Sequence, residues 1–506
     1  QAWSTWIRET PSSERPPARG RALLISYQFP PTGGSGVQRA AKLARYLPQA
    51  GWELEVLTAA HERFPWCDLS LVDDVPADTR VHRVAGLEPA CVARAFARFA
   101  GSNPQARQWL EDRMFWRLSA VTGRLGLGDG ESLWVRAATR AAVRLCRRGR
   151  IDALITTGPP HFVHDVGRWV AAATGLPWIA DLRDPLVSDF DRTASAEAHR
   201  VRRRRAERRI VRKASVIVTT CEALAADLRG RYPDRAARIR CVFNGFDRAD
   251  ILPVAESNTT ASREERSEFW LVAAGAFYGR REVARIVEPL ADLLRDRPQW
   301  QGRVRFVLAG TLDAQQQRYW QRHRPAWMTL AGYVDHATAV AMTLQADCAV
   351  VVVPECRHGR MSIPGKTFEL LALPTHILGL VPPSSETEAI LRRAGGSTVA
   401  PFEDATRVRA AIEAIIAAHF DGTLSAQRDW IYVDRFDRRS AAQAFAMLLD
   451  DLCPSSGRSS PKRSDIIQLY PVHEGPAPIE RARISEAPRA ASIRATMPAE
   501  ELAGVP

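Results

Sequence analysis

The chain has 506 residues, of which 46% are hydrophobic and 25% are charged, and its formal net charge is +13. This length suits two domains, and the apolar content suffices for two cores. No run of 18 apolar residues predicts a membrane-spanning helix, and the N-terminus lacks the charged start and apolar core of a signal peptide. A cytoplasmic location is therefore expected, with peripheral contact to the inner face of a membrane left open.

The charge and the cysteines narrow the function classes. A strongly basic chain favours an anionic partner such as nucleic acid, an acidic lipid surface or a phosphorylated small molecule, and the charge does not choose among them; the arginine-rich usage of a GC-rich genome explains the charge equally well. The eight cysteines are scattered without a CxxC pair, so neither a zinc site nor a disulfide framework is predicted. No recognised nucleic-acid module is present, and no nucleic-acid partner is expected.

The first half of the chain predicts a Rossmann-like domain over residues 21–252. Residues 1–20 are rich in Pro, Ser and Arg and predict a disordered leader. Short apolar runs then alternate with longer helical patterns, as in parallel βα units whose sheet is covered on both faces. The predicted strands are 22–27, 54–58, 153–157, 178–182, 215–220 and 238–243.

A polar segment at 253–267 predicts a linker, and residues 268–429 repeat the alternation as a second Rossmann-like domain. Its predicted strands are 269–275, 303–310, 348–353 and 376–381, with helices at 281–297, 311–323, 335–345, 386–394 and 404–418. Residues 430–452, with a helix at 438–451, are expected to pack back on the first domain, and 453–506 predict a disordered tail. Two doubly wound sheets place a ligand cleft between their facing carboxyl ends.

The first strand is followed by a glycine-rich turn that could hold a phosphate. Gly33, Gly34, Ser35 and Gly36 precede a helix, where backbone N–H groups and the helix dipole favour an anion. This is not the dinucleotide fingerprint, because Arg39 stands at the third glycine position. A merely flexible turn remains the alternative.

Polar side chains also follow the later strands of the first domain. TTGPPHFVH places His161 and His164 at the start of a helix, and DLRDP places Asp181, Arg183 and Asp184 at the next strand end. Carboxyl ends of parallel strands are where open α/β sheets bind ligands. We therefore expect these three DLRDP residues to line an acceptor cleft.

The second domain supplies groups suited to a nucleoside diphosphate. Arg280 and Arg281 follow its first strand and suit a diphosphate, and Gly332, Tyr333 and Val334 could offer backbone groups to a base. In SIPGKTFELLAL, Gly365 and Lys366 suit phosphate, whereas Glu369 suits ribose hydroxyls. An ordinary surface pair between Lys366 and Glu369 is the alternative.

The ordered set ISYQFPPTGGSGVQR, TTGPPH, IADLRDP, FNGFD, GYVDH and PGKTFELLA resembles bacterial family 4 retaining glycosyltransferases from about residue 21 to 450. The resemblance implies the GT-B fold, with an acceptor-side first domain and a second domain that binds the nucleotide sugar. It implies that Glu369 contacts the ribose and that His161 lies near the donor sugar. It also implies that Arg280, Arg281 and Lys366, with the glycine turn, stabilise the leaving diphosphate. Met361 stands where the family carries the first of two glutamates.

The resemblance implies metal-independent transfer with retained configuration and without a cofactor, in polysaccharide or glycolipid assembly. The acceptor is left open between a glycan, a lipid-linked glycan and a small molecule. The triplet Asp189–Phe190–Asp191 is interpreted as a coincidental match to a metal motif. An inactive scaffold and a nucleotide-sugar epimerase of the same fold remain alternatives. The basic segment 199–213 either contacts an acidic membrane or is simply solvated.

Overall fold

The computed structural model describes residues 2–8, 15–33, 35–60, 68–87, 89–97, 99, 104–124, 133–187, 197–257 and 266–454. All the described residues belong to one compact unit, which holds two parallel sheets. The predicted tail from residue 455 onward and the Asp189–Phe190–Asp191 triplet lie outside the described residues. Over the part that is described, no helix combines the length and apolar character needed to cross a bilayer.

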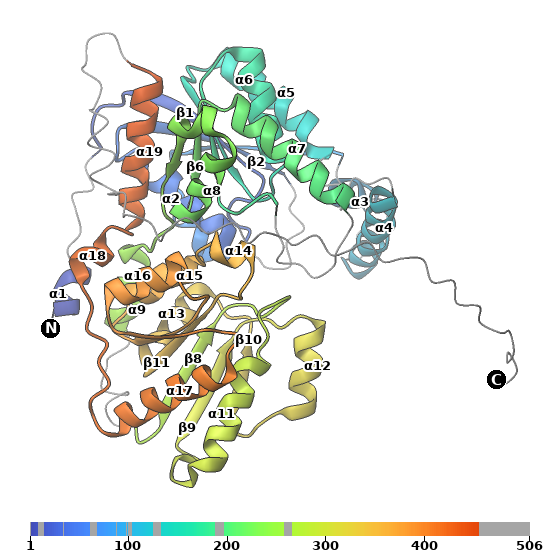
Figure 1. Cartoon of the computed structure of the whole chain (residues 1–506). Coiled ribbons are helices and arrows are strands. Elements are labelled where there is room, and N and C mark those ends of the chain that lie inside the picture. Colours follow the sequence, from blue (N-terminus) through green and yellow to red (C-terminus); the bar gives the residue numbers. More distant parts are fainter. Residues whose placement is uncertain are drawn as a thin grey trace, which may run out of the picture. The chain divides into compact units, whose positions relative to one another are not determined.

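The first lobe, the upper one in Figure 1, is built on a seven-stranded sheet. Its strand order is β3-β2-β1-β4-β5-β6-β7. All pairs are parallel, and Leu24 of β1 stands opposite Val56 of β2 on one side and Ile155 of β4 on the other. The strands are β1 (Gly20–Ser26), β2 (Trp52–Ala59), β3 (Arg80–Val84), β4 (Ala153–Gly158), β5 (Trp178–Leu182), β6 (Val216–Thr219) and β7 (Ile239–Cys241). The inner strands are buried along nearly their whole length, which explains their unbroken apolar sequences.

Helices cover both faces of this sheet and also extend the lobe. They are α2 (Ser35–Tyr46), α3 (Pro89–Ala97), α4 (Pro104–Arg124), α5 (Trp134–Arg148), α6 (Val163–Thr174), α7 (Glu197–Lys213), α8 (Glu222–Arg231) and α9 (Arg248–Ser257). From the far end of the chain, α19 (Arg438–Leu452) lies against α2 and contributes Phe445 and Leu449 to the same apolar cluster as Leu43.

The second lobe repeats the design with a six-stranded sheet in the order β10-β9-β8-β11-β12-β13. Its strands are β8 (Phe269–Ala274), β9 (Val304–Ala309), β10 (Met328–Gly332), β11 (Cys348–Val352), β12 (His376–Leu380) and β13 (Ser397–Ala400). Its helices are α11 (Ala284–Asp296), α12 (Ala314–His323), α13 (His336–Gln345), α14 (Arg357–Arg360), α15 (Gly365–Leu371), α16 (Glu386–Ala394) and α17 (Ala405–Phe420), followed by the short α18 (Trp430–Asp434). The strand order reverses direction beside β1 in the first sheet and beside β8 in the second. This reversal confirms the predicted pair of doubly wound domains.

Two segments differ from the sequence expectation. Residues 2–8 of the predicted disordered leader form helix α1 (Ala2–Arg8), because Trp6 stacks on Trp430 at a centroid distance of 4.8 Å and lies under the guanidinium of Arg248. Helix α9 extends to Ser257 and so covers the first residues of the predicted linker, with Pro253 inside it. Trp6 and Ile7 are buried, and this apolar contact outweighs the polar composition around them.

The docking of α1 is testable by stability. Replacing Trp6 by alanine removes a buried indole and its ring contacts, so we expect a loss of about 3 kcal/mol in the free energy of unfolding. The matched control is Trp169→Ala, because that ring is half exposed and its loss changes stability little. Urea unfolding measures both variants. Equal stability of the Trp6 variant and the wild type would show that α1 does not belong to the folded unit.

Candidate active site

Lys366 lies at the carboxyl end of the first strand of the second lobe. Its Nζ donates a hydrogen bond to the carbonyl oxygen of Ala274, the last residue of β8, at 2.8 Å. Burial, with the charge of Arg281 as the next cause, lowers the pKa of Lys366 to about 7, against the opposing effect of Glu369. An ammonium that is partly withdrawn from water in this way favours an anion beside it.

Gly275 makes room for this lysine. Its φ is +123°, and a Cβ built there would stand 2.9 Å from the Nζ of Lys366. Glycine is therefore required both by the backbone conformation and by the close approach of the side chain. The turn that follows β8 therefore leaves the space that the side chain of Lys366 occupies.

The two arginines of this turn add positive charge. Gly279 N donates to Asp313 Oδ2 at 2.9 Å, which fixes the turn that presents Arg280 and Arg281. The Nε of Arg280 is buried and has no hydrogen-bond partner among the described residues. The arginines therefore lie at the same strand end as Lys366, as the sequence predicts for a diphosphate site.

Glu369 lies one helical turn beyond Lys366 and is paired with His336, whose Nε2 is 3.1 Å from Glu369 Oε1. Burial opposes ionisation, but the charge of His336 and hydrogen bonds from His336 and Gln38 lower the pKa of Glu369 to about 2. Burial also opposes the charged form of His336, and Glu369 outweighs it and raises the pKa of His336 to about 9. The carboxylate is therefore ionised at neutral pH.

His336 is not among the site residues that the sequence predicts. It is the last residue of the quoted GYVDH motif, and α13 begins with it, capped by Asp335. Gly332 in the same motif has a φ of +74°, Tyr333 is exposed, and Val334 is half-buried. The signal that could have identified His336 is its place directly after a strand end, the rule that was applied to the other lobe.

In the first lobe the glycine turn continues directly into a helix. Gly33 is buried, α2 begins at Ser35, and Gly36 stands in its first turn rather than before it. Gly34 and the side chain of Ser35 lie outside the described residues. Arg183 holds this turn, because its guanidinium donates to the carbonyl oxygens of Gly36 and Pro159.

Asp181 does not face a cleft, which corrects the expectation from the sequence. It is fully buried, and its carboxylate accepts bidentate hydrogen bonds from Arg39 at 2.8 and 2.9 Å and another from Thr157 Oγ1 at 2.7 Å. Both carboxylate oxygens of Asp181 therefore accept hydrogen bonds from residues inside the first lobe. Asp181 fixes the carboxyl edge of the sheet instead of contacting an acceptor.

His161 and Asp184 stay at the edge of the first lobe that meets the second. Burial, with His164 as the next cause, lowers the pKa of His161 to about 3, so the ring is neutral at pH 7. Asp184 Oδ1 accepts a hydrogen bond from Ser362 Oγ at 3.1 Å, which links the DLRDP loop to the loop before Lys366. The neighbouring Met361 is buried, and its carbonyl oxygen accepts from Cys221 Sγ at 3.0 Å.

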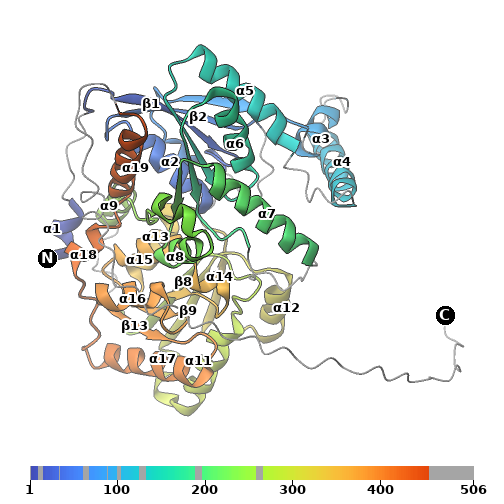
Figure 2. The ribbon, with the colours of Figure 1, turned by 45° about the horizontal axis from the view of Figure 1, so that its top comes forward.

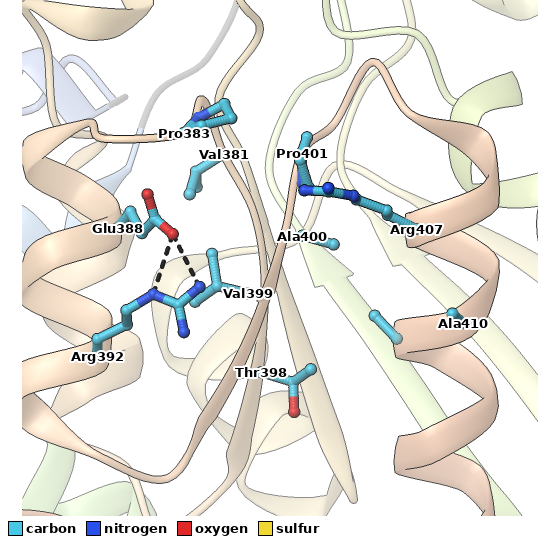
Figure 3. A pocket seen from close by; sticks show the side chains of 11 residues that line it. Val381, Pro383, Glu388, Arg392, Thr398, Val399, Ala400, Pro401, Arg407 and Ala410 are labelled. Atoms are coloured by element: carbon cyan, nitrogen blue, oxygen red, sulfur yellow. Dashed lines mark hydrogen bonds and ion pairs between the residues drawn. The ribbon is translucent and has the colours of Figure 1, made fainter.

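Two further features lie apart from these residues. Asp74, Asp247 and Asp250 gather closely enough to hold a cation, but the ammonium of Lys42 contacts all three at 2.5 to 2.8 Å and already compensates them. A cavity of about 390 Å³ opens between β13, α16 and α17, where Glu388 accepts from Arg392 and Arg407 stands across from it (Figure 3). None of the predicted site residues lines this cavity.

Comparison with known proteins identifies the first lobe. Residues 33–245 match the family model of the glycosyl transferase 4-like domain. No curated protein sequence matches the chain significantly. The solved structures that match this chain share few identical residues with it, so their likeness shows the fold alone.

Three of these solved structures illustrate the likeness. Sucrose-phosphate synthase from Thermosynechococcus elongatus is 18% identical, with a TM-score of 0.57 over 86% of this chain and 99% of that chain. HepE from Anabaena, solved with UDP and glucose, is 13% identical, with a TM-score of 0.56 over 86% and 100%. A candidate UDP-N-acetylglucosamine 2-epimerase from Listeria monocytogenes is 11% identical, with a TM-score of 0.53 over 88% and 99%.

The His336–Glu369 pair gives the protein a defined dependence of stability on pH. The folded-state pKa of His336, about 9, lies above its ordinary 6.5, so its contribution is complete below pH 6.5 and is lost as the pH rises through 9. We expect His336→Gln to lower the unfolding free energy by about 1–2 kcal/mol at pH 6 and by much less at pH 9.5. Urea unfolding at both pH values checks this, with the exposed His323→Gln as control. A deficit that does not change with pH would contradict the pairing.

Proposed function

Because residues 33–245 are a glycosyl transferase 4-like domain within a GT-B fold, we propose that this chain is an active glycosyltransferase. It takes a sugar from a nucleoside-diphosphate sugar and transfers it to an acceptor hydroxyl with retained configuration and without a metal. One observation carries the proposal. At the end of β8, the switch point of the second sheet, Lys366 bonds the carbonyl oxygen of Ala274, and Arg281 and Glu369 lie close enough to shift the pKa of Lys366 in opposite directions.

The diphosphate of the donor would bind beside the cationic side chains of this site. Lys366 has a depressed pKa because it is buried beside Arg281, and a phosphate would supply the missing counter-charge. Arg280, on the same turn, adds a fork-shaped donor suited to phosphate oxygens. The glycine turn at Gly33, Gly34, Ser35 and Gly36 would face the same group from the first lobe.

The nucleoside of the donor would bind beside the carboxylate of Glu369. Glu369 is ionised, and its carboxylate can accept hydrogen bonds from two ribose hydroxyls in place of those from His336 and Gln38. The GYVDH turn, with Gly332, Tyr333 and Val334, would offer backbone groups to the base. Gly365 opens the helix that carries both Lys366 and Glu369.

In the transfer step the bond between the anomeric carbon and the diphosphate oxygen breaks, and the acceptor oxygen bonds to that carbon from the same face. The acceptor proton passes to the departing phosphate, so no separate base is needed. Charge builds on the leaving group, and the fixed cations Lys366, Arg280 and Arg281 would stabilise it. No cofactor takes part in this scheme.

The sugar would lie between the lobes, beside His161 and Asp184. Met361 is a thioether without a carboxylate, and its side chain is buried in an apolar cluster, so another residue would have to take the role of the family's first glutamate. Asp184 is a carboxylate held beside that segment, through Ser362. We assign to Asp184 and the neutral His161 the contacts to the sugar hydroxyls, with Arg183 keeping their loops in place.

Polysaccharide or glycolipid assembly is the proposed setting, with a glycan or a lipid-linked glycan as acceptor. An inactive scaffold would bind the donor without turnover. A nucleotide-sugar epimerase would change the sugar without needing an acceptor, and it requires acid and base carboxylates beside the sugar ring. The experiment below separates these three activities.

The proposal is tested by nucleotide release from a panel of nucleotide sugars in the presence of EDTA. We expect slow hydrolysis of one donor by the wild type and a loss of at least 100-fold in kcat/KM for Glu369→Ala, since removing a charged hydrogen-bond partner costs about 3 kcal/mol. Glu388→Ala on the same lobe, outside the site, is the control and keeps full activity. Donor binding without release would identify a scaffold. An epimerised donor would identify an epimerase, and complete loss in EDTA would overturn metal independence.

The low pKa of Lys366 predicts how donor affinity depends on pH. A bound diphosphate favours the protonated lysine, whose pKa in the free protein is about 7, so affinity falls as the pH rises from 7 to 9. The slope approaches roughly tenfold per pH unit at most, because one proton is linked to binding. Calorimetric titration with the donor measures it. Lys366→Arg keeps its charge and gives a flat profile; a wild-type profile that is equally flat would contradict the role of Lys366.

A further inference from the structure

Two outer helices of the first lobe, α5 and α7, carry many exposed arginines. Helix α6 lies between α5 and α7, and these three helices cover one side of the sheet (Figure 1). Every arginine of α5 is exposed, and every arginine over residues 200–213 of α7 is exposed together with Lys213. Helix α5 contains no acidic residue, and Glu207 of α7 is buried and paired with Arg231. Over the described side chains of α5 and α7, no exposed carboxylate accompanies these arginines, so the two helices present a strongly positive surface.

The arginines of α7 are arranged as a stripe. Arg205, Arg208, Arg209 and Arg212 are spaced by three and four residues, which places them on one face of the helix. The opposite face carries Ile210 and Val211 into the core. The helix is therefore held by its apolar side while its guanidinium groups project outward.

Exposed apolar side chains occur in the same lobe, on the hairpin formed by α3 and α4. The two helices pack against each other, and Figures 1 and 2 show the hairpin at the outer edge of the first lobe, on the side of α5 and α7. Phe99 is 86% exposed, Trp109 is 60% exposed, and Phe96 is 49% exposed. The rings of Phe96 and Phe99 contact each other at a centroid distance of 6.4 Å, and with Trp109 they give the hairpin an exposed aromatic tip that water solvates poorly.

We propose that this face, the arginines of α5 and α7 with the tip of the α3–α4 hairpin, binds an anionic phospholipid bilayer. Guanidinium groups pair with lipid phosphates, and aromatic rings settle at the interface between headgroups and acyl chains. A nucleic acid would use the same arginines, but it offers no apolar phase for Phe96 and Phe99. Both kinds of side chain gain contacts only at a lipid surface.

Membrane binding by this face is independent of the transfer reaction, because it uses no residue of the proposed active site. If the transfer reaction also holds, a bilayer on this face would present a lipid-linked acceptor to the same lobe that carries Asp184 and His161. The acceptor class would then be lipid-linked rather than a free sugar. Vesicle binding can be measured without any donor, so failure of one proposal is distinguishable from failure of the other.

The test is sedimentation with phosphatidylcholine vesicles that contain or lack phosphatidylglycerol. We expect the wild type to bind only the anionic vesicles, and binding to weaken as salt rises. The triple variant Arg205→Gln, Arg208→Gln, Arg212→Gln should bind about 100-fold more weakly, at roughly fivefold for each arginine. The control is Arg318→Gln, Arg322→Gln, Arg324→Gln on the second lobe, which removes the same charge from exposed positions and keeps wild-type binding.

The aromatic tip is tested separately by Phe96→Ser, Phe99→Ser, Trp109→Ser. All three side chains are exposed, so folding is expected to be unchanged, which circular dichroism verifies. This variant should dissociate from anionic vesicles at lower salt than the wild type. Equal loss in the lobe-two control, or equal binding to neutral vesicles, would overturn the proposal. Binding of a homopolymeric RNA with no vesicle binding would instead identify a nucleic-acid surface.

Discussion

The buried ion pair between Arg39 and Asp181 is the contact on which the first half of the site depends. Arg39 comes from α2, and Asp181 comes from β5, 142 residues later. The remaining guanidinium hydrogens are given to Val242, Phe243 and Asn244. Taking two charges out of water costs several kcal/mol each, and only such complete hydrogen bonding offsets that cost. The pair thus fixes the glycine turn relative to the strand ends of β4, β5 and β7.

The junction between the lobes uses a second set of polar contacts. Glu386, at the start of α16, accepts hydrogen bonds from Glu222 N and Ala223 N, so a residue of the second lobe caps α8 of the first. Cys221 and Met361 meet beside this cap. A glutamate in place of Met361 would carry its charge into a buried apolar cluster at a large desolvation cost. The departure from the family pattern is thus consistent with the packing of this junction.

The fold was largely predictable, because strands buried on both faces leave continuous apolar runs such as 153–157 and 178–182. Strand β3 was not predicted, since this edge strand reads RVHRV and is mostly polar. Helix α1 was missed because its burial depends on Trp430, more than 400 residues away. Local sequence carries no sign of such a partner.

The same limit applies to the candidate site. Lys366, Glu369 and the two arginines are found from sequence because each follows a strand end in a short motif. Asp181 follows the same rule, yet its partner Arg39 takes it into the interior. His336 was overlooked although it completes the GYVDH motif, because its role depends on Glu369 on another helix. Position at a strand end therefore selects candidates, and long-range pairing decides among them.

Glu369 also explains how the two lobes can act together on one ligand. Without a donor, its carboxylate is shared between His336 of its own lobe and Gln38 of α2, which also carries the glycine turn. A ribose that takes over these hydrogen bonds removes a contact between the lobes while its diphosphate offers a new one at the glycine turn. The exchange keeps the number of hydrogen bonds to the carboxylate nearly constant, so it costs little free energy. In the proposed donor complex, the donor would replace the Gln38–Glu369 hydrogen bond as a link between α2 and the second lobe.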